Sequence, residues 1–330
     1  MARTRYATDR GLIVRMGGTM FLLGLVFTGF VIALYFVLRY YNRGGSSGSG
    51  AGLIFFVALI GIGTAFASYF WSDKIALRTS GARLVGPADS LEAKRLHEVM
   101  DRLCALADMP KPRIAIAPTS MPNAFATGRS SKVAVLCATQ GLLARLDDNE
   151  ELEGVLAHEM SHVAHKDVAV MTIASFLGII AALLVRFAFY SELFGGGGGR
   201  GRGGRGGGNN QGGGVPIMLI VMVVGMVVYA VSFLLIRLLS RYRELSADRS
   251  GALLTGQPAK LASALVKVTG DIARIPTKDL RAAEPLNAFY FAPALSPRKG
   301  QLSLSTMFST HPSLDKRLAQ LDKIAKQLNR

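Results

Sequence analysis

Residues 158 to 162 read His-Glu-Met-Ser-His and match the H-E-x-x-H pattern of zinc-binding helices. Residues four apart share one face of an α-helix, so the imidazoles of His158 and His162 can converge on one ion. Glu159 then flanks the coordination position that stays open to water. At the His and Glu frequencies of this chain, the pattern arises by chance in roughly two of a thousand such chains. It therefore predicts a metal-dependent catalytic site.

Zinc needs a third protein ligand, and His165 cannot supply it. It lies seven residues after His158, about 10.5 Å along the axis of a regular helix. Glu244 and Asp248 are a better source, because they are spaced i and i+4 on a second helical segment. One carboxylate can bind the metal while the other accepts the second N–H of a ligand histidine.

Their position along the chain supports this pairing independently. His162 lies five residues before Asp167, where a hydrophobic segment starts, and Glu244 lies seven residues after Arg237, where another ends. If both segments cross a membrane, the two residues lie roughly 8 to 10 Å from the same membrane face. Two hydrophobic segments that enter the membrane and return without crossing it would also place both residues near one membrane face. The alternative for Glu244 is a simple juxtamembrane charge beside two arginines.

With these residues in place, the chain resembles the HtpX-type membrane zinc metalloproteases, gluzincins related to the prenyl-protein endopeptidases. The segments that carry the resemblance are the N-terminal hydrophobic pair and residues 122–128, 155–162, 244–248, 287–289 and 309–312. The resemblance implies one zinc ion per chain, with His158, His162 and Glu244 as ligands and Glu159 as catalytic acid/base. A glycine-rich insert between the third and fourth hydrophobic segments departs from the family pattern.

Further residues are expected at or near the site. Asp248 is expected to accept the N–H of a ligand histidine, the alternative being a helix ion pair with a neighbouring arginine. His311 is a candidate hydrogen-bond donor to a developing oxyanion, or else a loop or cap residue. The stretch Asn123, Ala124 and Phe125 is expected at a strand edge that could pair with an extended substrate.

Half of the 330 residues are apolar and only 18% are charged, which excludes a disordered chain. The apolar residues concentrate in four stretches, at about 16–38, 53–71, 168–190 and 215–237. As helices they would be roughly 27 to 35 Å long, enough to cross a hydrocarbon core. The sequence thus predicts a multi-pass membrane protein.

The expected fold is α+β and mostly helical, an N-terminal transmembrane hairpin plus a gluzincin-like catalytic domain interrupted by a second hydrophobic hairpin. The predicted boundaries are 1–83 for the first hairpin, 84–167 and 240–330 for the two parts of the protease domain, and 168–239 for the second hairpin. Within the protease domain the patterns predict helices at 88–107 and 312–329, strands at 113–117 and 132–137, and a strand edge plus turn at 123–131. A helix capped by Asp147, Asp148 or Asn149 is expected to continue into the third hydrophobic segment.

The net charge of +16 is explained by basic residues beside the hydrophobic segments, which favour anionic lipid headgroups, so no nucleic-acid partner is expected. The positive-inside bias predicts a cell (inner) membrane protein whose catalytic domain faces the cytoplasm. Residues 195–214 hold 14 of the 37 glycines and three arginines, a pattern that also occurs in RNA-binding tracts. The two cysteines are expected to be ordinary buried thiols in a reducing compartment.

Three protein ligands leave one position for a water whose pKa the metal lowers toward about 7. The sequence therefore predicts an endopeptidase that cleaves unfolded or damaged membrane proteins at the cytoplasmic face, in quality control and stress response. One alternative is a dedicated processing protease for lipid-bearing peptides. The other is a non-catalytic membrane scaffold that uses the Gly/Arg-rich loop to bind RNA.

Overall fold

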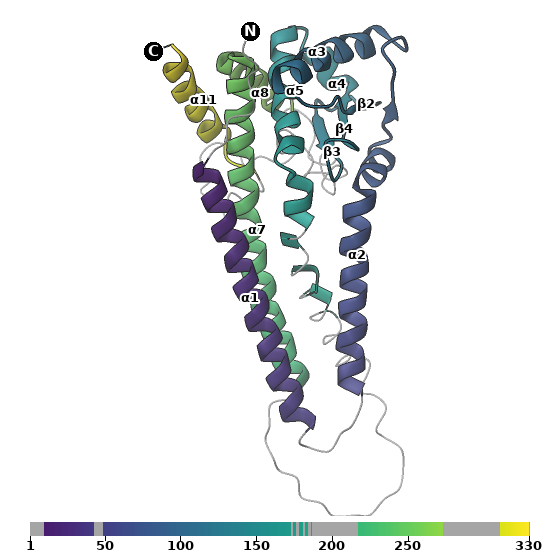
Figure 1. The fold of residues 1–330 in the computed structure, drawn as a ribbon, viewed down its shortest axis with the longest axis vertical. Helices are drawn as coiled ribbons and strands as arrows, with labels where there is room; N and C mark the ends of the chain where they lie inside the picture. Colours follow the sequence, from purple (N-terminus) through teal and green to yellow (C-terminus); the bar gives the residue numbers. More distant parts are fainter. Residues whose placement is uncertain are drawn as a thin grey trace, which may run out of the picture. The chain divides into compact units, whose positions relative to one another are not determined.

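The structure is a computed structural model that describes residues 10–42, 49–172, 217–272 and 311–329, with part of 174–186 (Figure 1). The helices are α1 (Arg10–Asn42), α2 (Ser49–Ser80), α3 (Leu91–Ala107), α4 (Gln140–Arg145), α5 (Asn149–Ala164), α7 (Ile217–Thr255), α8 (Pro258–Ile272) and α11 (Leu314–Leu328). The strands are β1 (Arg83–Leu84), β2 (Arg113–Ala117), β3 (Ala124–Thr127) and β4 (Val135–Thr139). The Gly/Arg-rich loop 195–214 and the segment 287–289 lie outside the described residues.

The chain divides into two compact units, and each is described by itself. One contains residues 18–66 and 172–236, mainly hydrophobic helix. The other contains residues 1–17, 67–171 and 237–330 and includes every candidate site residue. The candidate chemistry therefore belongs to a single unit of the molecule.

Among the described residues, two helical segments are long and apolar enough to cross a membrane, Ile13–Phe30 in α1 and Met222–Thr255 in α7. They overlap the predicted segments 16–38 and 215–237. The predicted segment 53–71 lies within α2, and 168–190 falls partly outside the described residues, so their crossing stays a prediction. At 39 residues, α7 is about 58 Å long, roughly twice the thickness of a hydrocarbon core. The helix therefore extends well beyond any membrane it crosses.

A four-stranded mixed sheet, in the order β1-β2-β4-β3, forms the centre of the second unit. β2 and β4 are parallel, while β1 and β3 pair antiparallel with their neighbours. The strand predicted at 113–117 is confirmed. The strand predicted at 132–137 begins later, at Val135. Gly128 adopts φ 116° and closes a tight turn in which a Cβ would lie 2.8 Å from the Cα of Ala134, so residues up to Ala134 belong to the connection.

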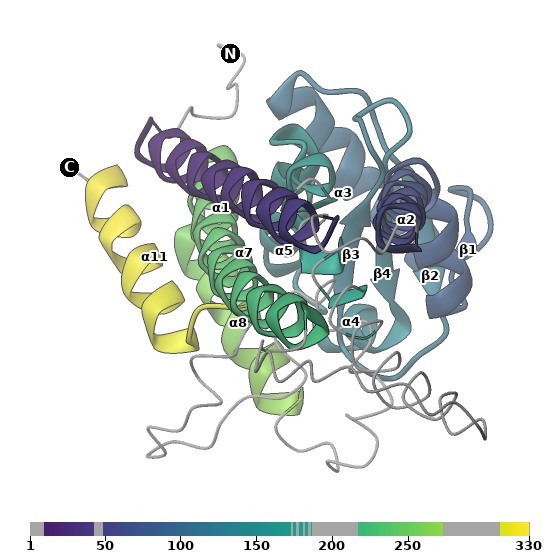
Figure 2. The same cartoon turned by 90° about the horizontal axis from the view of Figure 1, so that it is seen from below.

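Alternate residues of the sheet face two different layers. One face, including Ile114 and Leu136, packs in the main core with α3 and α5, and α8 and α11 complete that core (Figure 2). The other face, including Phe125 and Cys137, packs against Ala76 near the end of α2. Both faces are therefore covered, which explains why all five residues of β4 are buried.

Both cysteines are free and buried, as expected. Burial raises the pKa of the Cys104 thiol to about 11 and that of Cys137 to about 12. At neutral pH each thiol is therefore protonated and acts as a small apolar side chain.

Helix α5 is buried on nearly all sides, as its residues from Glu151 to Ser161 show. Of the three capping candidates, Asp148 is the N-cap, and its side chain accepts from the backbone N–H of Glu150. The prediction that this helix continues into the third hydrophobic segment is wrong. It ends at Ala164, because Lys166 adopts a left-handed φ of 56° and turns the chain before helix resumes at residue 167.

Close packing between α5 and α7 depends on Gly251. A Cβ at this position of α7 would lie 2.9 Å from the backbone nitrogen of His158 and 3.2 Å from its Cα. These contacts are with backbone, which cannot move aside cheaply. The absence of a side chain at residue 251 therefore sets how near the two helices approach beside the candidate site.

We expect Gly251→Ala to destabilise the protein by about 1 to 3 kcal/mol, because the added methyl group forces α7 away from α5. The matched control is Gly270→Ala, in α8, where a Cβ meets nothing within 4 Å and the substitution should be neutral or stabilising by up to about 1 kcal/mol. Thermal unfolding midpoints of the two purified variants test this. Equal midpoints would contradict the role assigned to Gly251.

Candidate metal centre

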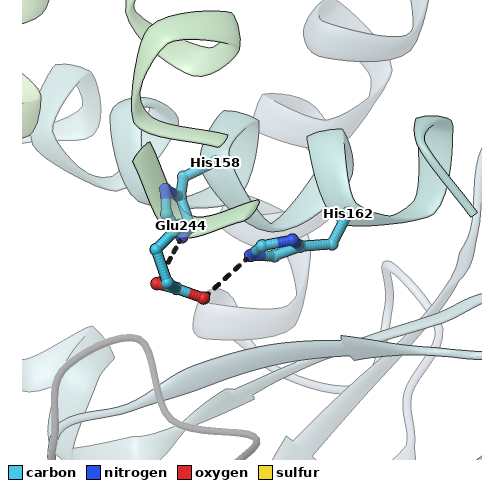
Figure 3. A group of neighbouring side chains, drawn as sticks. All are labelled: His158, His162 and Glu244. Carbon is cyan, nitrogen blue, oxygen red and sulfur yellow. Dashed lines mark ion pairs between the residues drawn. The ribbon is translucent and has the colours of Figure 1, made fainter. Parts of the chain in front are cut away.

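Three potential metal ligands converge between two helices. His158 and His162 project from adjacent turns of α5, and Glu244 faces them from α7 (Figure 3). Their ligand atoms all lie within 4.8 Å of one another. The Glu244 carboxylate lies 3.7 Å from Nε2 of His158 through Oε2 and 3.5 Å from Nε2 of His162 through Oε1. The structure thus brings together the three residues that the sequence predicts as ligands.

The two imidazoles present the same ring nitrogen to Glu244, although the rings are nearly perpendicular. Each directs Nε2 toward Glu244, and their planes cross at 87° with ring centroids 5.0 Å apart. The other nitrogen of each ring faces a carboxylate: Nδ1 of His158 lies 2.9 Å from Oδ1 of Asp248, and Nδ1 of His162 lies 2.5 Å from Oδ2 of Asp167. A carboxylate at Nδ1 keeps the proton there and leaves the Nε2 lone pair for a metal.

Asp167 is not among the residues that the sequence predicts at the site. Five residues of regular helix would rotate it by about 140° from His162, onto a different face. The turn at Lys166 returns its side chain toward the histidine. A pattern search that assumes continuous helix cannot find this contact.

Each of these outer carboxylates also binds an arginine. Arg243 places Nε 2.9 Å from Oδ2 of Asp167. Arg317 of α11, 69 residues beyond Asp248, donates to both of its oxygens, with Nε to Oδ2 at 2.7 Å and Nη2 to Oδ1 at 2.6 Å. The sequence prediction considered only arginines next to Asp248 along the chain. The missed signal was an arginine on the apolar stripe of the C-terminal helix, where Leu321 also lies.

The charges of the site fit a divalent cation. The carboxylates of Glu159, Asp167, Glu244 and Asp248 are all buried, as is the guanidinium of Arg317, and that of Arg243 is 14% exposed. With these six groups ionised and both ligand imidazoles neutral, as metal binding requires, the cluster carries a formal charge of −2. An uncompensated charge is costly in a buried site, and a divalent cation among the three ligand atoms removes it.

Glu159 occupies the position expected of an acid/base. Its Oε2 accepts a hydrogen bond from the backbone N–H of Ala126, at 3.1 Å, and only 4% of the residue is exposed. Burial raises the pKa of this carboxyl above its usual value. A raised pKa suits a group that must take up a proton and later release it.

The predicted substrate-binding stretch lies at the edge of the sheet. Ala124 and Phe125 belong to β3, the terminal strand, and Asn123 directly precedes it. Their side chains are buried, Phe125 pairs with Cys137 in the ladder, and the N–H of Ala126 points toward Glu159. The backbone of this strand therefore runs beside the candidate acid/base, and its use by a substrate stays a prediction.

His311 lies against the ligand carboxylate. Its Nδ1 is 3.1 Å from Oε2 of Glu244, and the residue is buried just before α11 begins. The structure therefore brings His311 to the candidate metal centre. Donation to an oxyanion, the expectation from the sequence, stays a prediction.

Comparison with known proteins is consistent with this geometry. The profile of peptidase family M48 matches residues 90–325. "Protease HtpX homolog 1" of Streptomyces coelicolor is 54% identical over 327 residues, covering 99% of this chain and 97% of that protein. "Protease HtpX homolog 2" of Methanosarcina mazei is 46% identical, covering 99% of this chain and 100% of that protein.

Among solved structures, a crystal structure of S. mikatae Ste24p aligns with a TM-score of 0.47 and 17% identity, covering 95% of this chain and 67% of that one. The family profile and both relatives cover most of the length of this chain. The chain belongs to peptidase family M48 and is a membrane-linked metallopeptidase of the HtpX type.

Proposed function

We propose that this protein is a zinc-dependent endopeptidase that binds one Zn²⁺ per chain through His158, His162 and Glu244. The observation that carries the proposal is the convergence of these three ligand atoms within 4.8 Å, beside the buried carboxylate of Glu159. Two imidazoles and one carboxylate are ligand types that zinc accepts, and three protein ligands leave a coordination position free for catalysis.

The chemistry divides between the ion and the protein. A bound zinc ion supplies a Lewis acid that acidifies a water and polarises a peptide carbonyl. Glu159 takes the proton from the attacking water and later delivers it to the leaving nitrogen. The N–H of Ala126 orients the Glu159 carboxylate, and Asp248 and Asp167 orient the two imidazoles. His311, next to Glu244, is a candidate donor to the developing oxyanion.

The proposed substrates are unfolded or damaged membrane proteins. An edge strand beside the acid/base suits an extended backbone, which unfolded segments supply more readily than folded ones. The alternative substrate class is a lipid-bearing peptide. A non-catalytic RNA-binding scaffold is disfavoured by the match to a peptidase family and by the complete ligand set.

The proposed location is the cell (inner) membrane, in multi-pass form, with the catalytic unit facing the cytoplasm. Two described segments have the length and apolarity of membrane-spanning helices. Basic residues lie before the first and after the second helix of each predicted hairpin. The positive-inside bias favours the cytoplasmic side for such residues.

Zinc binding should release about one proton per ion at pH 7.5. Burial alone would lower the pKa of His158, but the carboxylates of Asp248 and Glu244 outweigh it and raise the pKa to about 9. The metal-free imidazole is therefore protonated below about pH 9, including the window from about pH 6.5 to 9 in which an ordinary histidine is neutral, and zinc must displace that proton. Apparent affinity should rise roughly tenfold per pH unit in this window. Calorimetric zinc titrations in two buffers of different ionisation enthalpy measure the release, and heats that agree between the buffers would contradict it.

Glu159→Gln should keep one zinc per chain yet lower peptide cleavage by about 10²- to 10⁴-fold, because the amide fits the same space but cannot accept a proton. Elemental analysis and casein hydrolysis by the purified zinc-loaded protein measure the two properties. Glu98→Gln, an exposed carboxylate on α3, is the control and should match wild type in both. Retained turnover in Glu159→Gln would remove this residue from the mechanism.

The loop 195–214 should lie on the membrane face opposite the catalytic unit, because two crossings flank it. Trypsin added outside intact spheroplasts should then cut at its arginines while sparing helix α3. If trypsin cuts the loop only after the membrane is opened, the loop lies in the cytoplasm. That result would contradict the crossing of both segments and favour an RNA-binding role for the loop.

A further inference from the structure

Arg317 is the most completely buried arginine or lysine among the described residues. It lies on the inner face of α11 with Leu321 and Ile324, and 2% of the residue is exposed. Basic side chains are rarely buried unless they are paired. Its Nε and Nη2 donate to the two oxygens of Asp248 in a fork, at 2.7 and 2.6 Å. This is a bidentate, charge-assisted contact, which fixes the orientation of both partners.

The same guanidinium also reaches the ligand carboxylate. Its Nη1 lies 3.9 Å from Oε2 of Glu244. Glu244 and Asp248 are like charges one turn apart on α7, and such pairs repel, more strongly when buried. One planar cation between them offsets that repulsion for both.

The contact with Asp248 continues to the metal ligand. Oδ1 of Asp248, which accepts from Nη2 of Arg317, is the oxygen that lies 2.9 Å from Nδ1 of His158. Arg317, Asp248 and His158 thus form a continuous chain that leads from α11 through α7 to α5. The fork allows little rotation of the Asp248 carboxylate, so the arginine decides where that oxygen points.

We propose that Arg317 is a positioning residue of the metal centre: it holds Asp248 against His158 and offsets the charge of Glu244, so that zinc affinity depends on helix α11. This inference rests on the proposed function, because zinc is the ion whose binding it describes. Arg243 makes the corresponding contact with Asp167 near His162, but it is adjacent to Glu244 in the chain. A substitution at Arg317 therefore tests the contact without changing a residue next to a metal ligand in the chain.

The test compares zinc affinity, by chelator competition, in wild type, Arg317→Gln and Arg317→Lys. Arg317→Gln should weaken zinc binding by about 10- to 100-fold, the usual effect of losing an outer partner of a metal ligand. Arg317→Lys should recover part of the loss, because a lysine keeps the charge but cannot form the fork. Leu321→Ala is the control: it removes buried packing from the same helix and should lower the unfolding temperature while zinc affinity stays within about twofold.

A double-mutant cycle shows whether Arg317 acts through Asp248. Adding Arg317→Gln to Asp248→Asn should weaken zinc binding by clearly less than Arg317→Gln does in the wild type, because the contact through Asp248 is already lost and only the 3.9 Å contact with Glu244 remains to be removed. The double variant removes both charges of the fork and so leaves no ionised Asp248 without its arginine, which keeps it measurable if Arg317→Gln alone folds poorly. Multiplicative losses in the cycle would overturn the inference.

The inference and the proposed function fail in distinguishable ways. Wild-type protein that binds zinc while Arg317→Gln binds it equally tightly overturns the positioning role alone. A loss of zinc affinity in Leu321→Ala as large as that in Arg317→Gln also overturns it, since the effect would then be general to α11. Wild-type protein that takes up no zinc overturns the proposed function and the positioning role together.

Discussion

The burial of four carboxylates in one small volume is the constraint on which the rest of the site depends. Glu159, Asp167, Glu244 and Asp248 are almost inaccessible to solvent, so each needs a donor or a cation within the protein. Two arginines, two imidazoles and one backbone amide supply these contacts. The remaining formal charge of −2 matches the ion that a metallopeptidase requires. The ion pairs that offset the buried charges are therefore the same contacts that orient the candidate metal ligands.

This constraint explains why the site needs elements from distant parts of the chain. Helix α5 supplies both histidines and Glu159, α7 supplies Glu244 and Asp248, and α11 supplies Arg317. Glu244 and Asp248 are one turn apart on α7, so a single rotation of the helix about its axis presents both carboxylates to α5. The close approach at Gly251 brings that face of α7 to α5.

Much of the site could be predicted because it follows local periodicity. Spacing of four residues places His158 beside His162 and Glu244 beside Asp248, and both relations need only a regular helix. The cap at Asp148 and the alternating strand 113–117 are local in the same sense. The pairing of the two helices could also be predicted, because a hydrophobic segment follows His162 and another precedes Glu244, which places both residues near the same membrane face.

The residues that were missed depend on departures from regularity or on long-range contacts. Asp167 reaches His162 through a left-handed residue, Lys166, where no glycine marks the turn. Arg317 meets Asp248 across 69 residues, and only its place on an apolar stripe distinguishes it from the other basic residues of α11. A charged residue on an apolar helix face could thus be read as a sign of a buried partner, although the partner's identity depends on tertiary packing.

The edge strand joins substrate binding to the orientation of the proposed base. Ala126 donates its N–H to Glu159 because β3 is in register with β4 through the pair Phe125 and Cys137. A slip of one residue would turn that N–H toward β4 and move Phe125 to the opposite face. Burial of Phe125 against Ala76 opposes such a slip. The packing of one aromatic side chain on the far face of the sheet thus helps to hold the register that presents a backbone donor to Glu159, on the strand where an extended substrate is proposed to bind.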